Sequence, residues 1–536
     1  MRLESMKPLL FVLPLVITSS ALAQLPPMPA PPQNPVTEAK RILGKALFWD
    51  EQLSSDNTVA CGTCHRPASG GGDPTAGQPG SNHPGLDSIF GTPDDKRASR
   101  GVIAQDTSED YDPSTAFDFA KQVTDRASPS HLGAGHFPEL FWDGRATGQF
   151  LNPETGAISI PNGGALESQA VGPILSSVEM AYEGRTWDDV RNKLERVDPL
   201  ALAFNLNPDL TAALSGGVSY PDLFNTAFGD SAITAERIGF ALATYERTLN
   251  PDQTPWDRHQ AGIPGSLTPN QIDGMMAFGS PQSRCTQCHQ PPLFSDGSYR
   301  NLGLRPIGED NGRRNVTGQF GDRGRFKVPS LRNVGLRTRF MHQGQFSQLP
   351  QIMGFYDQDG GPNNANKDPL LTGLMVPPPV GQAIVDFLAN GLTDPRVAAE
   401  APPFDRPRLN TERLITNPEI VGTGTNGSGG MVPTLIAETP PRLGSRDFKL
   451  GVHDALGGAH GFVVWYLSAP GAPGYARRMA VTLSGSGAGN GFATSQFNLP
   501  NDPTLSGLEL WGQFWVLDPG AAGNFARSPF AHVTLF

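Results

Sequence analysis

Two short runs decide the fold of this chain: Cys61-Gly62-Thr63-Cys64-His65 and Cys285-Thr286-Gln287-Cys288-His289. Each is a Cys-x-x-Cys-His run, the pattern at which c-type haem is attached. The two thiols of a run form thioethers with the haem vinyl groups, and the histidine that follows ligates the iron. All 4 cysteines of the 536 residues lie in these runs. The sequence therefore predicts two covalently bound haem c groups, with iron ligands at His65 and His289.

Other uses of the cysteines explain the pattern less well. A structural zinc site joins two Cys-x-x-Cys pairs that lie much closer together in sequence, and it needs no histidine directly after each pair. Disulfides form in oxidising compartments, but they leave the two histidines unexplained. A thioredoxin-like redox pair is expected near a strand–helix unit, whereas Cys61 follows the polar stretch Ser54–Thr58.

The N-terminus has the pattern of a secretory signal peptide at residues 1–23. Arg2 and Lys7 precede an apolar stretch, and Ala21-Leu22-Ala23 is a small-residue cleavage site. The apolar stretch is too short to span a membrane, and we expect no membrane span elsewhere. Residues 24–35 are expected to form a Pro-rich linker. Export through the membrane predicts a periplasmic protein, which agrees with covalent haem.

Composition narrows the range of partners. The formal net charge is −11, which argues against binding to nucleic acid or to anionic lipid and favours basic partners. The chain holds 62 glycines and 51 prolines, which predicts long loops between modest helices and strands.

Helical periodicity surrounds each Cys-x-x-Cys-His run. Ala39, Ile42, Leu43 and Leu47 recur at helical spacing before the first run. Thr268-Pro269-Asn270-Gln271 is a capping-box start for a helix before the second run. We therefore expect a mainly α protein with two cytochrome c-like haem domains in tandem, at residues 36–205 and 206–400.

The character of the chain changes after Ala401-Pro402-Pro403, which we interpret as a linker. Apolar runs bounded by Gly, Pro, Asn and Ser follow, at 462–467, 479–483, 508–517 and 530–536. Such runs predict strands. Residues 405–536 are therefore expected to form an all-β, sandwich-like module, whose role the sequence leaves open.

Several separate motifs carry a resemblance to a known family. They are Leu43-Gly44-Lys45-Ala46-Leu47-Phe48, Phe141-Trp142-Asp143-Gly144-Arg145-Ala146, Gln169 with Gly172-Pro173, Ser177-Val178-Glu179-Met180, Asp257-Arg258, 326–333 and Met341-His342-Gln343-Gly344. In this order they resemble the bacterial dihaem cytochrome c peroxidases, including the MauG-like branch. The likeness covers about residues 36–395 and leaves the β module outside it.

The resemblance implies a division of work between the two haems. The haem on His65 is expected to react with hydrogen peroxide, and the haem on His289 to transfer electrons. Glu179 is expected to be the acid–base catalyst, because cleavage of the O–O bond moves a proton between the two oxygens, and an apolar pocket raises the pKa of a carboxyl group to suit that task. Gln169, Phe141 and Pro173 are expected to line the same pocket.

Trp142 is expected between the haems, where it would pass oxidising equivalents. An alternative interpretation is a core aromatic residue, since tryptophan usually serves packing. His342 is expected to support the second haem through polar contacts.

The sixth ligand of the second haem falls in 349–361. The commoner peroxidases have Met there and the MauG-like branch has Tyr. We favour Tyr356 over Met353 or Met341 as a metal ligand. A tyrosine phenolate stabilises ferric iron, whereas a thioether stabilises ferrous iron.

Two features of the family have an uncertain counterpart here. Many members have a distal histidine after the first haem, and His83 is the one histidine of the corresponding loop, in a setting that matches poorly. The family also has an inter-haem calcium ion, but Ala127 stands where Asn is expected. Carbonyl oxygens near Lys327 and Pro329 could still bind calcium, so both questions stay open.

The sequence thus predicts a periplasmic peroxidase that acts on hydrogen peroxide, with a small cytochrome c or copper protein as electron donor. A MauG-like oxidase of a protein side chain and a non-catalytic dihaem electron carrier are the alternatives. The oligomeric state stays open between a monomer and a homodimer.

Overall fold

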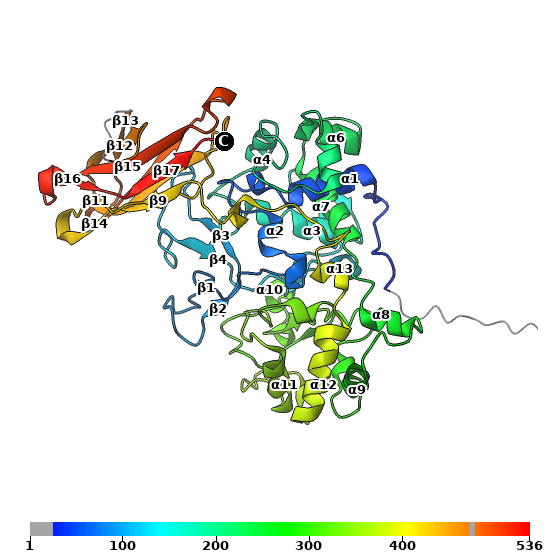
Figure 1. The fold of residues 1–536 in the computed structure, drawn as a ribbon. Coiled ribbons are helices and arrows are strands. Elements are labelled where there is room, and N and C mark those ends of the chain that lie inside the picture. The colour runs from blue at the N-terminus through cyan, green and yellow to red at the C-terminus, as the bar shows by residue number, and fades with distance from the viewer. Residues whose placement is uncertain (1–24, 471–476) are drawn as a thin grey trace, which may run out of the picture.

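The computed structural model describes residues 25–470 and 477–536, and its parts form three lobes. In Figure 1 the lobe with the first Cys-x-x-Cys-His run lies above the lobe with the second, and the β module projects to the upper left. The predicted signal peptide lies outside the described residues. Within them, no helix is both long and apolar enough to cross a membrane.

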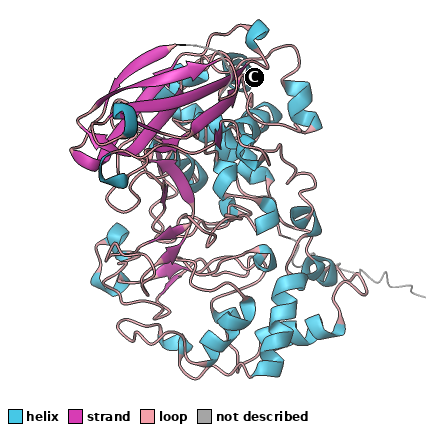
Figure 2. Ribbon diagram, turned by 60° about the vertical axis from the view of Figure 1, so that its left-hand side comes forward, coloured by secondary structure: helices cyan, strands magenta, loops and turns pink. Residues whose placement is uncertain are grey.

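The helices are short and joined by long loops, as the glycine and proline content predicts (Figure 2). They are α1 (Glu38–Phe48), α2 (Cys61–Cys64), α3 (Ala165–Ala170), α4 (Trp187–Leu194), α5 (Pro208–Ala213), α6 (Tyr220–Phe228), α7 (Ala235–Thr248), α8 (Pro255–Gln260), α9 (Pro269–Phe278), α10 (Arg314–Thr317), α11 (Leu349–Asp357), α12 (Pro378–Asp386) and α13 (Pro395–Ala398). The capping box expected at α9 is present, because the side chain of Thr268 accepts a hydrogen bond from the N–H of Gln271.

Small antiparallel hairpins interrupt the loops of the two helical lobes. Their strands are β1 (Asn82–His83) with β2 (Lys96–Arg97), β3 (Arg100–Ile103) with β4 (Lys121–Val123), β5 (Phe150–Leu151) with β6 (Ile158–Ile160), and β7 (Tyr299–Arg300) with β8 (Phe326–Lys327). Of the whole chain, 28% is helical and 18% is strand. The expected mainly α class therefore describes the surroundings of the two runs better than it describes the whole chain.

The first hydrophobic core packs α1 against α7. Gly44 lies so close to α7 that a β-carbon would stand 1.9 Å from the carbonyl oxygen of Ala241, which explains a glycine inside a helix. The same core includes Val397, Phe404 and Leu409, which return to it after the second lobe. Residues 206–249 and 397–409, which the sequence placed in the second domain, the linker and the start of the β module, thus pack in the first core. We propose that the first domain extends through α7.

The Pro-rich segment before α1 is docked rather than free. The Asn34 side chain is fully buried and donates to the Glu167 carboxylate at 2.8 Å, and Arg247 donates to the carbonyl of Pro29 at 3.1 Å. This segment therefore closes one face of the first core.

The second core is built from the helices around the second run. Phe278 on α9, Phe294 and Phe387 meet at ring centroid distances of 6.0–6.1 Å. α11 and α12 complete this core, with Ile352 and Ile384 buried in it.

The C-terminal module is a sandwich of two antiparallel sheets, as predicted. Its strands are β9 (Glu419–Val421), β10 (Thr434–Ile436), β11 (Phe448–Gly457), β12 (His460–Tyr466), β13 (Arg478–Thr482), β14 (Gly487–Phe497), β15 (Glu509–Leu517), β16 (Phe525–Arg527) and β17 (Phe530–Thr534). One sheet has the order β10-β11-β14 and the other β13-β12-β15-β17-β9, with β16 on β15. Leu450, Val463 and Phe514 meet between them.

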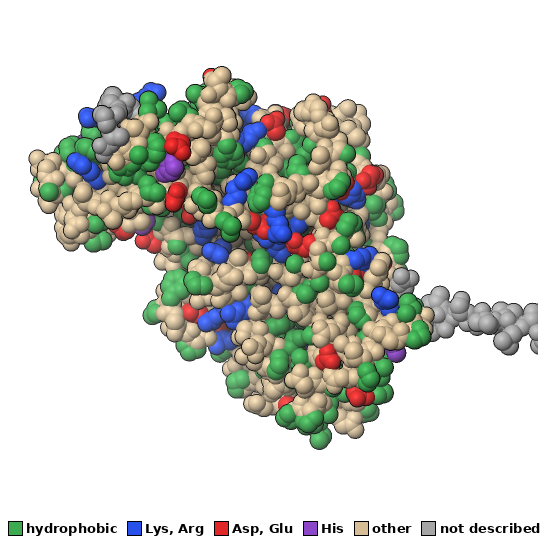
Figure 3. Space-filling model, viewed as in Figure 1, with side chains coloured by type: hydrophobic (Ala, Val, Ile, Leu, Met, Phe, Trp, Pro, Cys, Tyr) green, Lys and Arg blue, Asp and Glu red, His purple; other side chains and the backbone are tan. Residues whose placement is uncertain are grey.

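The module docks on the first lobe through both apolar and polar contacts. Ile436 packs with Ile103 and Tyr111, and the Lys449 ammonium donates to the side chain of Gln105. Charged side chains of both signs are interspersed over the face shown in Figure 3.

Candidate haem sites

A cavity of about 520 Å³ lies beside α2 in the first lobe, and Cys61, Cys64 and His65 line it. A second cavity, of about 190 Å³, lies in the second lobe and is lined by Cys285, Cys288 and His289. All four thiols are free. Each predicted attachment run therefore faces a cavity of its own.

The two histidines are held in the same way. His65 Nδ1 lies 3.1 Å from the carbonyl oxygen of Gly71, and His289 Nδ1 lies 3.0 Å from that of Phe294. A carbonyl only accepts, so each Nδ1 carries the proton and Nε2 keeps its lone pair. Burial lowers the pKa of both imidazoles, which keeps them neutral. This is the arrangement that orients a histidine ligand, so both runs fit haem c.

Glu179 lines the first cavity together with Gln169 and Pro173. Burial raises the pKa of the Glu179 carboxyl, while a hydrogen bond from Ser176 and the charge of Arg145 act in the opposite direction. This carboxyl group forms no ion pair with any described residue. It is thus a group that can hold or release a proton inside the cavity.

Strand β3 packs directly against the backbone of Glu179 and limits where it can lie. A β-carbon on Gly101 would stand 1.8 Å from the carbonyl oxygen of Val178 and 2.8 Å from the α-carbon of Glu179, so only glycine fits. Because β3 leads into the loop that contacts the β module, the C-terminal module supports one wall of the first cavity.

Phe141 also lines the first cavity, and its φ of 64° places it in the left-handed region. The guanidinium of Arg145 lies 3.6 Å from the centroid of its ring. Arg145 and the neighbouring Trp142 line the same cavity.

Trp142 stands between the cavities. It is 9% exposed, and its indole Nε1 donates to the carbonyl of Ala127 at 2.8 Å. Six residues line both cavities, namely Pro129, Ser130, Trp142, Lys327, Pro329 and Ser330. Trp142 is the aromatic residue in this shared wall.

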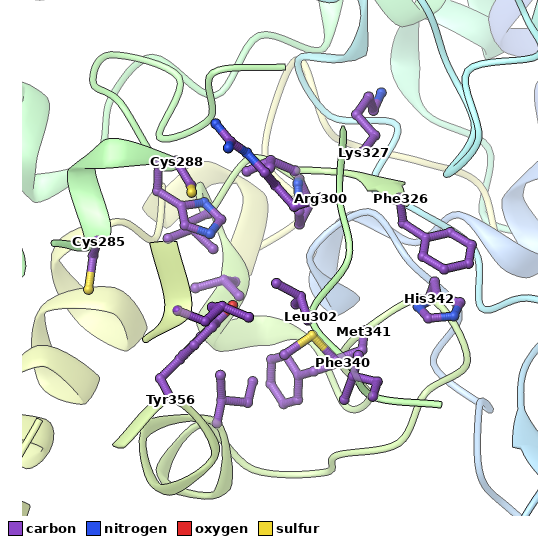
Figure 4. Close-up of a pocket in the computed structure, with 18 of the residues that line it drawn as sticks. Cys285, Cys288, Arg300, Leu302, Phe326, Lys327, Phe340, Met341, His342 and Tyr356 are labelled. Atoms are coloured by element: carbon purple, nitrogen blue, oxygen red, sulfur yellow. The ribbon is translucent and has the colours of Figure 1, made fainter. Parts of the chain in front are cut away.

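Tyr356 and Met341 both point into the second cavity (Figure 4). Burial is the main cause that raises the pKa of the Tyr356 phenol, and the Cys285 and Cys288 thiols add to it, so the phenol faces the attachment run. Met353 also borders the cavity, but it packs against Gly381 on α12.

His342 lines the second cavity and makes aromatic contacts with two neighbouring rings. Its ring stacks on Phe326 with centroids 3.6 Å apart and planes at 16°, and it meets Trp142 edge-on at 6.3 Å. Burial lowers its pKa to about 3, so it stays neutral. His342 therefore packs Trp142 against the second lobe.

His83 does not line the first cavity. It lies on β1, where its Nδ1 accepts a hydrogen bond from the N–H of Gly85 at 3.1 Å and its ring meets Phe117 at 5.5 Å. The arrangement brings it to the outer loop and not to the haem site.

The junction expected to hold calcium is occupied by protein cations. Arg126 bridges the two lobes, with Nη1 2.6 Å from Asp143 and Nη2 2.7 Å from Asp310. The carbonyl of Ala127 accepts from Trp142. Among the described residues, no three His, Cys, Asp or Glu side chains cluster as metal ligands. The side chains at this junction therefore supply the cation Arg126 and no set of carboxylate ligands for calcium among the described residues.

Sequence reasoning missed His131, which lines the first cavity beside His65. An alignment of the two halves of the chain provides a signal for it, because Pro129-Ser130-His131 repeats as Pro329-Ser330-Leu331.

Comparison with known proteins supports the family resemblance found in the sequence motifs. Residues 38–264 match the family model of the di-haem cytochrome c peroxidases. Cytochrome-c peroxidase IdrP1 of Pseudomonas sp. (strain SCT) is 28% identical over 68% of this chain and 84% of its own length. Methylamine utilization protein MauG of Methylophilus methylotrophus is 27% identical over 64% of this chain and 83% of its own.

A solved structure shares the fold. The crystal structure of a MauG-like protein associated with microbial copper homeostasis is 21% identical and has a TM-score of 0.50. The match covers 71% of this chain and 96% of the MauG-like chain. The family model and the named relatives agree with two c-type haems in this chain.

Proposed function

We propose that this chain, which belongs to the family of di-haem cytochrome c peroxidases and MauG-like proteins, reduces hydrogen peroxide to water. His65 would hold the haem at which peroxide reacts, and His289 the haem that receives electrons. The observation that carries this proposal is the unpaired carboxyl group of Glu179 in the first cavity, beside Gln169. The one acidic residue among the described residues that line the second cavity is Asp310, and its carboxylate is held in an ion pair by Arg126.

The overall reaction balances with two electrons. One hydrogen peroxide, two electrons and two protons give two molecules of water. The bound haem supplies the electrons for cleavage of the O–O bond. Glu179 accepts the proton of the peroxide oxygen nearer the haem and delivers it to the leaving oxygen, while the Gln169 amide orients the peroxide. The raised pKa of Glu179 lets one group serve as base and then as acid.

Trp142 carries charge between the two haems in this proposal. It is in the wall that both cavities share, and its contacts reach the backbone of the first lobe at Ala127 and the ring of His342 in the second. Its indole is the one aromatic ring among the described residues that line both cavities, which supports this route for charge.

A small cytochrome c or copper protein is the proposed electron donor, and the proposed location is the periplasm. The donor follows from the family, in which members are named as cytochrome c peroxidases. The location follows from the predicted signal peptide and from the covalent haem.

A MauG-like oxidase of a protein side chain is the second candidate. Tyr356 favours it, because this phenol points into the second cavity towards the attachment run (Figure 4). We propose that Tyr356 would be a further iron ligand of the haem held by His289, where a phenolate would stabilise ferric iron. A non-catalytic electron carrier is disfavoured, since a carrier needs no acid–base group in a cavity.

The decisive experiment compares Glu179→Gln with wild type, using the exported holoprotein, hydrogen peroxide and reduced cytochrome c. Gln keeps the shape but cannot take the proton, so turnover should fall on the order of 10²–10⁴-fold. Glu183→Gln is the matched control, because Glu183 is an exposed carboxylate four residues further on. Mass spectrometry should show two haems in all three proteins.

The competing functions give different results. Wild-type turnover in Glu179→Gln would remove Glu179 from the acid–base role. A wild-type protein that neither consumes peroxide nor oxidises cytochrome c would be a carrier. Peroxide consumption that needs a protein substrate in place of cytochrome c would identify the oxidase.

A further inference from the structure

We propose that His131 is a positioning residue for the first haem, which tunes the iron by sharing the Gly71 carbonyl with His65. This inference goes beyond the proposed function. It requires only that His65 ligates a haem, and it holds for a peroxidase, an oxidase or a carrier.

The geometry brings both imidazoles to one oxygen. His65 Nδ1 and His131 Nδ1 each lie 3.1 Å from the carbonyl oxygen of Gly71, and the two rings meet edge-on with centroids 5.4 Å apart. The backbone N–H of His131 also lies 3.3 Å from the same oxygen. Since the carbonyl only accepts, both imidazoles donate from Nδ1, and three donors share one acceptor.

A shared acceptor forms a weaker bond to each donor. The N–H of a ligating histidine makes the imidazole a stronger electron donor in proportion to how strongly it is hydrogen-bonded. Competition from His131 therefore leaves His65 a weaker donor than it would be with Gly71 to itself. A weaker donor favours the ferrous state, so His131 raises the reduction potential of the first haem.

The second lobe is an internal control for this arrangement. The carbonyls of Pro129 and Pro329 face His65 and His289, respectively, which places the two Pro-Ser pairs in register. The residue after the second pair is Leu331, which packs at the edge of the second core. The Phe294 carbonyl accepts from the imidazole of His289 and from no other described group.

The fold therefore has no need of an imidazole at this position. His131 is 4% exposed, and its Nε2 is buried without a hydrogen-bond partner among the described residues. Tuning of the neighbouring iron ligand accounts for the histidine.

The test is a spectroelectrochemical titration of the holoprotein in three variants. His131→Leu places at 131 the residue that the second lobe has at the matching position, Leu331. At a fixed potential, the ratio of ferric to ferrous first haem should rise about threefold to tenfold, the range expected for one hydrogen bond. His131→Asn keeps an N–H donor close to the position of Nδ1 and should stay near wild type. His136→Leu is the matched control, because His136 lies in the same segment outside the cavity.

A second readout reports the ligand itself. The iron–histidine stretching band of the ferrous first haem should move to higher frequency in His131→Leu, because His65 gains the full hydrogen bond. An unchanged potential and band in His131→Leu would overturn the proposal, and so would equal shifts in the Leu and Asn variants, which would assign the effect to packing.

The reciprocal variant keeps the proposal testable if His131→Leu does not fold. Leu331→His adds a competing donor in the second lobe and should raise the potential of the second haem, and a fixed potential would contradict the idea. Peroxide turnover is measured separately on the same samples. A shifted potential without peroxidase activity would support His131 and refute the proposed function.

Discussion

The two haem sites have the same attachment run and hold its histidine in the same way, but different side chains line most of each cavity. In both, a Cys-x-x-Cys-His run faces a cavity and the histidine is fixed through Nδ1 by a carbonyl six or five residues further on. The first cavity, of about 520 Å³, holds the unpaired carboxyl of Glu179, whereas the second, of about 190 Å³, holds the phenol of Tyr356. Attachment is therefore a local property, while reactivity depends on walls supplied by distant segments.

The largest effect is expected from removing one attachment run at a time. Cys61→Ala with Cys64→Ala should delete the first haem and abolish peroxide consumption, because no iron then faces Glu179. Cys285→Ala with Cys288→Ala should leave the first haem in place and abolish electron supply from cytochrome c. Haem mass and stopped-flow spectra with peroxide distinguish the two, and peroxide reactivity in the first variant would reverse the assignment of the sites.

The junction between the lobes should depend on Arg126 and not on calcium. Arg126→Gln leaves the buried carboxylate of Asp310 without its cation, while Asp143 keeps Arg145, and should destabilise folding by about 3 kcal/mol, the cost of breaking a buried pair. Arg145→Gln is the control, because Arg145 also bonds Asp143 but its side chain is 52% exposed. That variant should cost less than about 1 kcal/mol.

Chemical denaturation measures both variants, and a chelator should leave wild type unchanged. Destabilisation by the chelator, together with calcium in the purified protein, would restore the family's ion to this junction.

The second haem should respond to its proposed tyrosine ligand. Tyr356→Met replaces an oxygen donor by a thioether and should raise the potential of this haem on the order of 100 mV, within the range that axial ligands span. The first haem should not change, which makes it the control inside the same molecule. An unmoved potential for the second haem would point to Met341 as the ligand.

The smallest expected effect is a difference between the two haem sites in the pH dependence of their reactions. Since the pKa of Glu179 is raised above 4.5, its base form disappears at a higher pH than that of an ordinary glutamate. The value of kcat/KM for peroxide should therefore fall about tenfold per pH unit below this pKa and level off above it. Oxidation of cytochrome c by the second haem should not show this fall at low pH. A profile of kcat/KM for peroxide that is flat down to pH 4.5 would contradict the role of Glu179.

The short motifs can be interpreted from the sequence because their chemistry is local. Five consecutive residues suffice for haem attachment, so the two runs were found without any knowledge of the fold. The capping box at Thr268 is likewise formed by neighbours in sequence. Strands β12, β13, β15 and β17 were predicted from their apolar runs, whereas β11 and β14 gave no such signal.

Other features arise only when distant segments pack. The spacing of apolar residues in α7 does not show that this helix packs on α1, because an apolar helix face does not specify its partner. The place of Trp142 in a wall shared by both cavities, and the Arg126 bridge to Asp310, likewise depend on how the lobes meet.

The amino-acid sequence by itself determined that this protein carries two haems and offers Glu179 and Tyr356 as their candidate partners, since covalent attachment and motif order are written in short stretches. Only the tertiary structure decided which carbonyl holds each histidine, and that His131 shares the one at Gly71. The physical reason is that hydrogen bonds between segments depend on positions in space, which residues 60 apart acquire only through packing of the whole core.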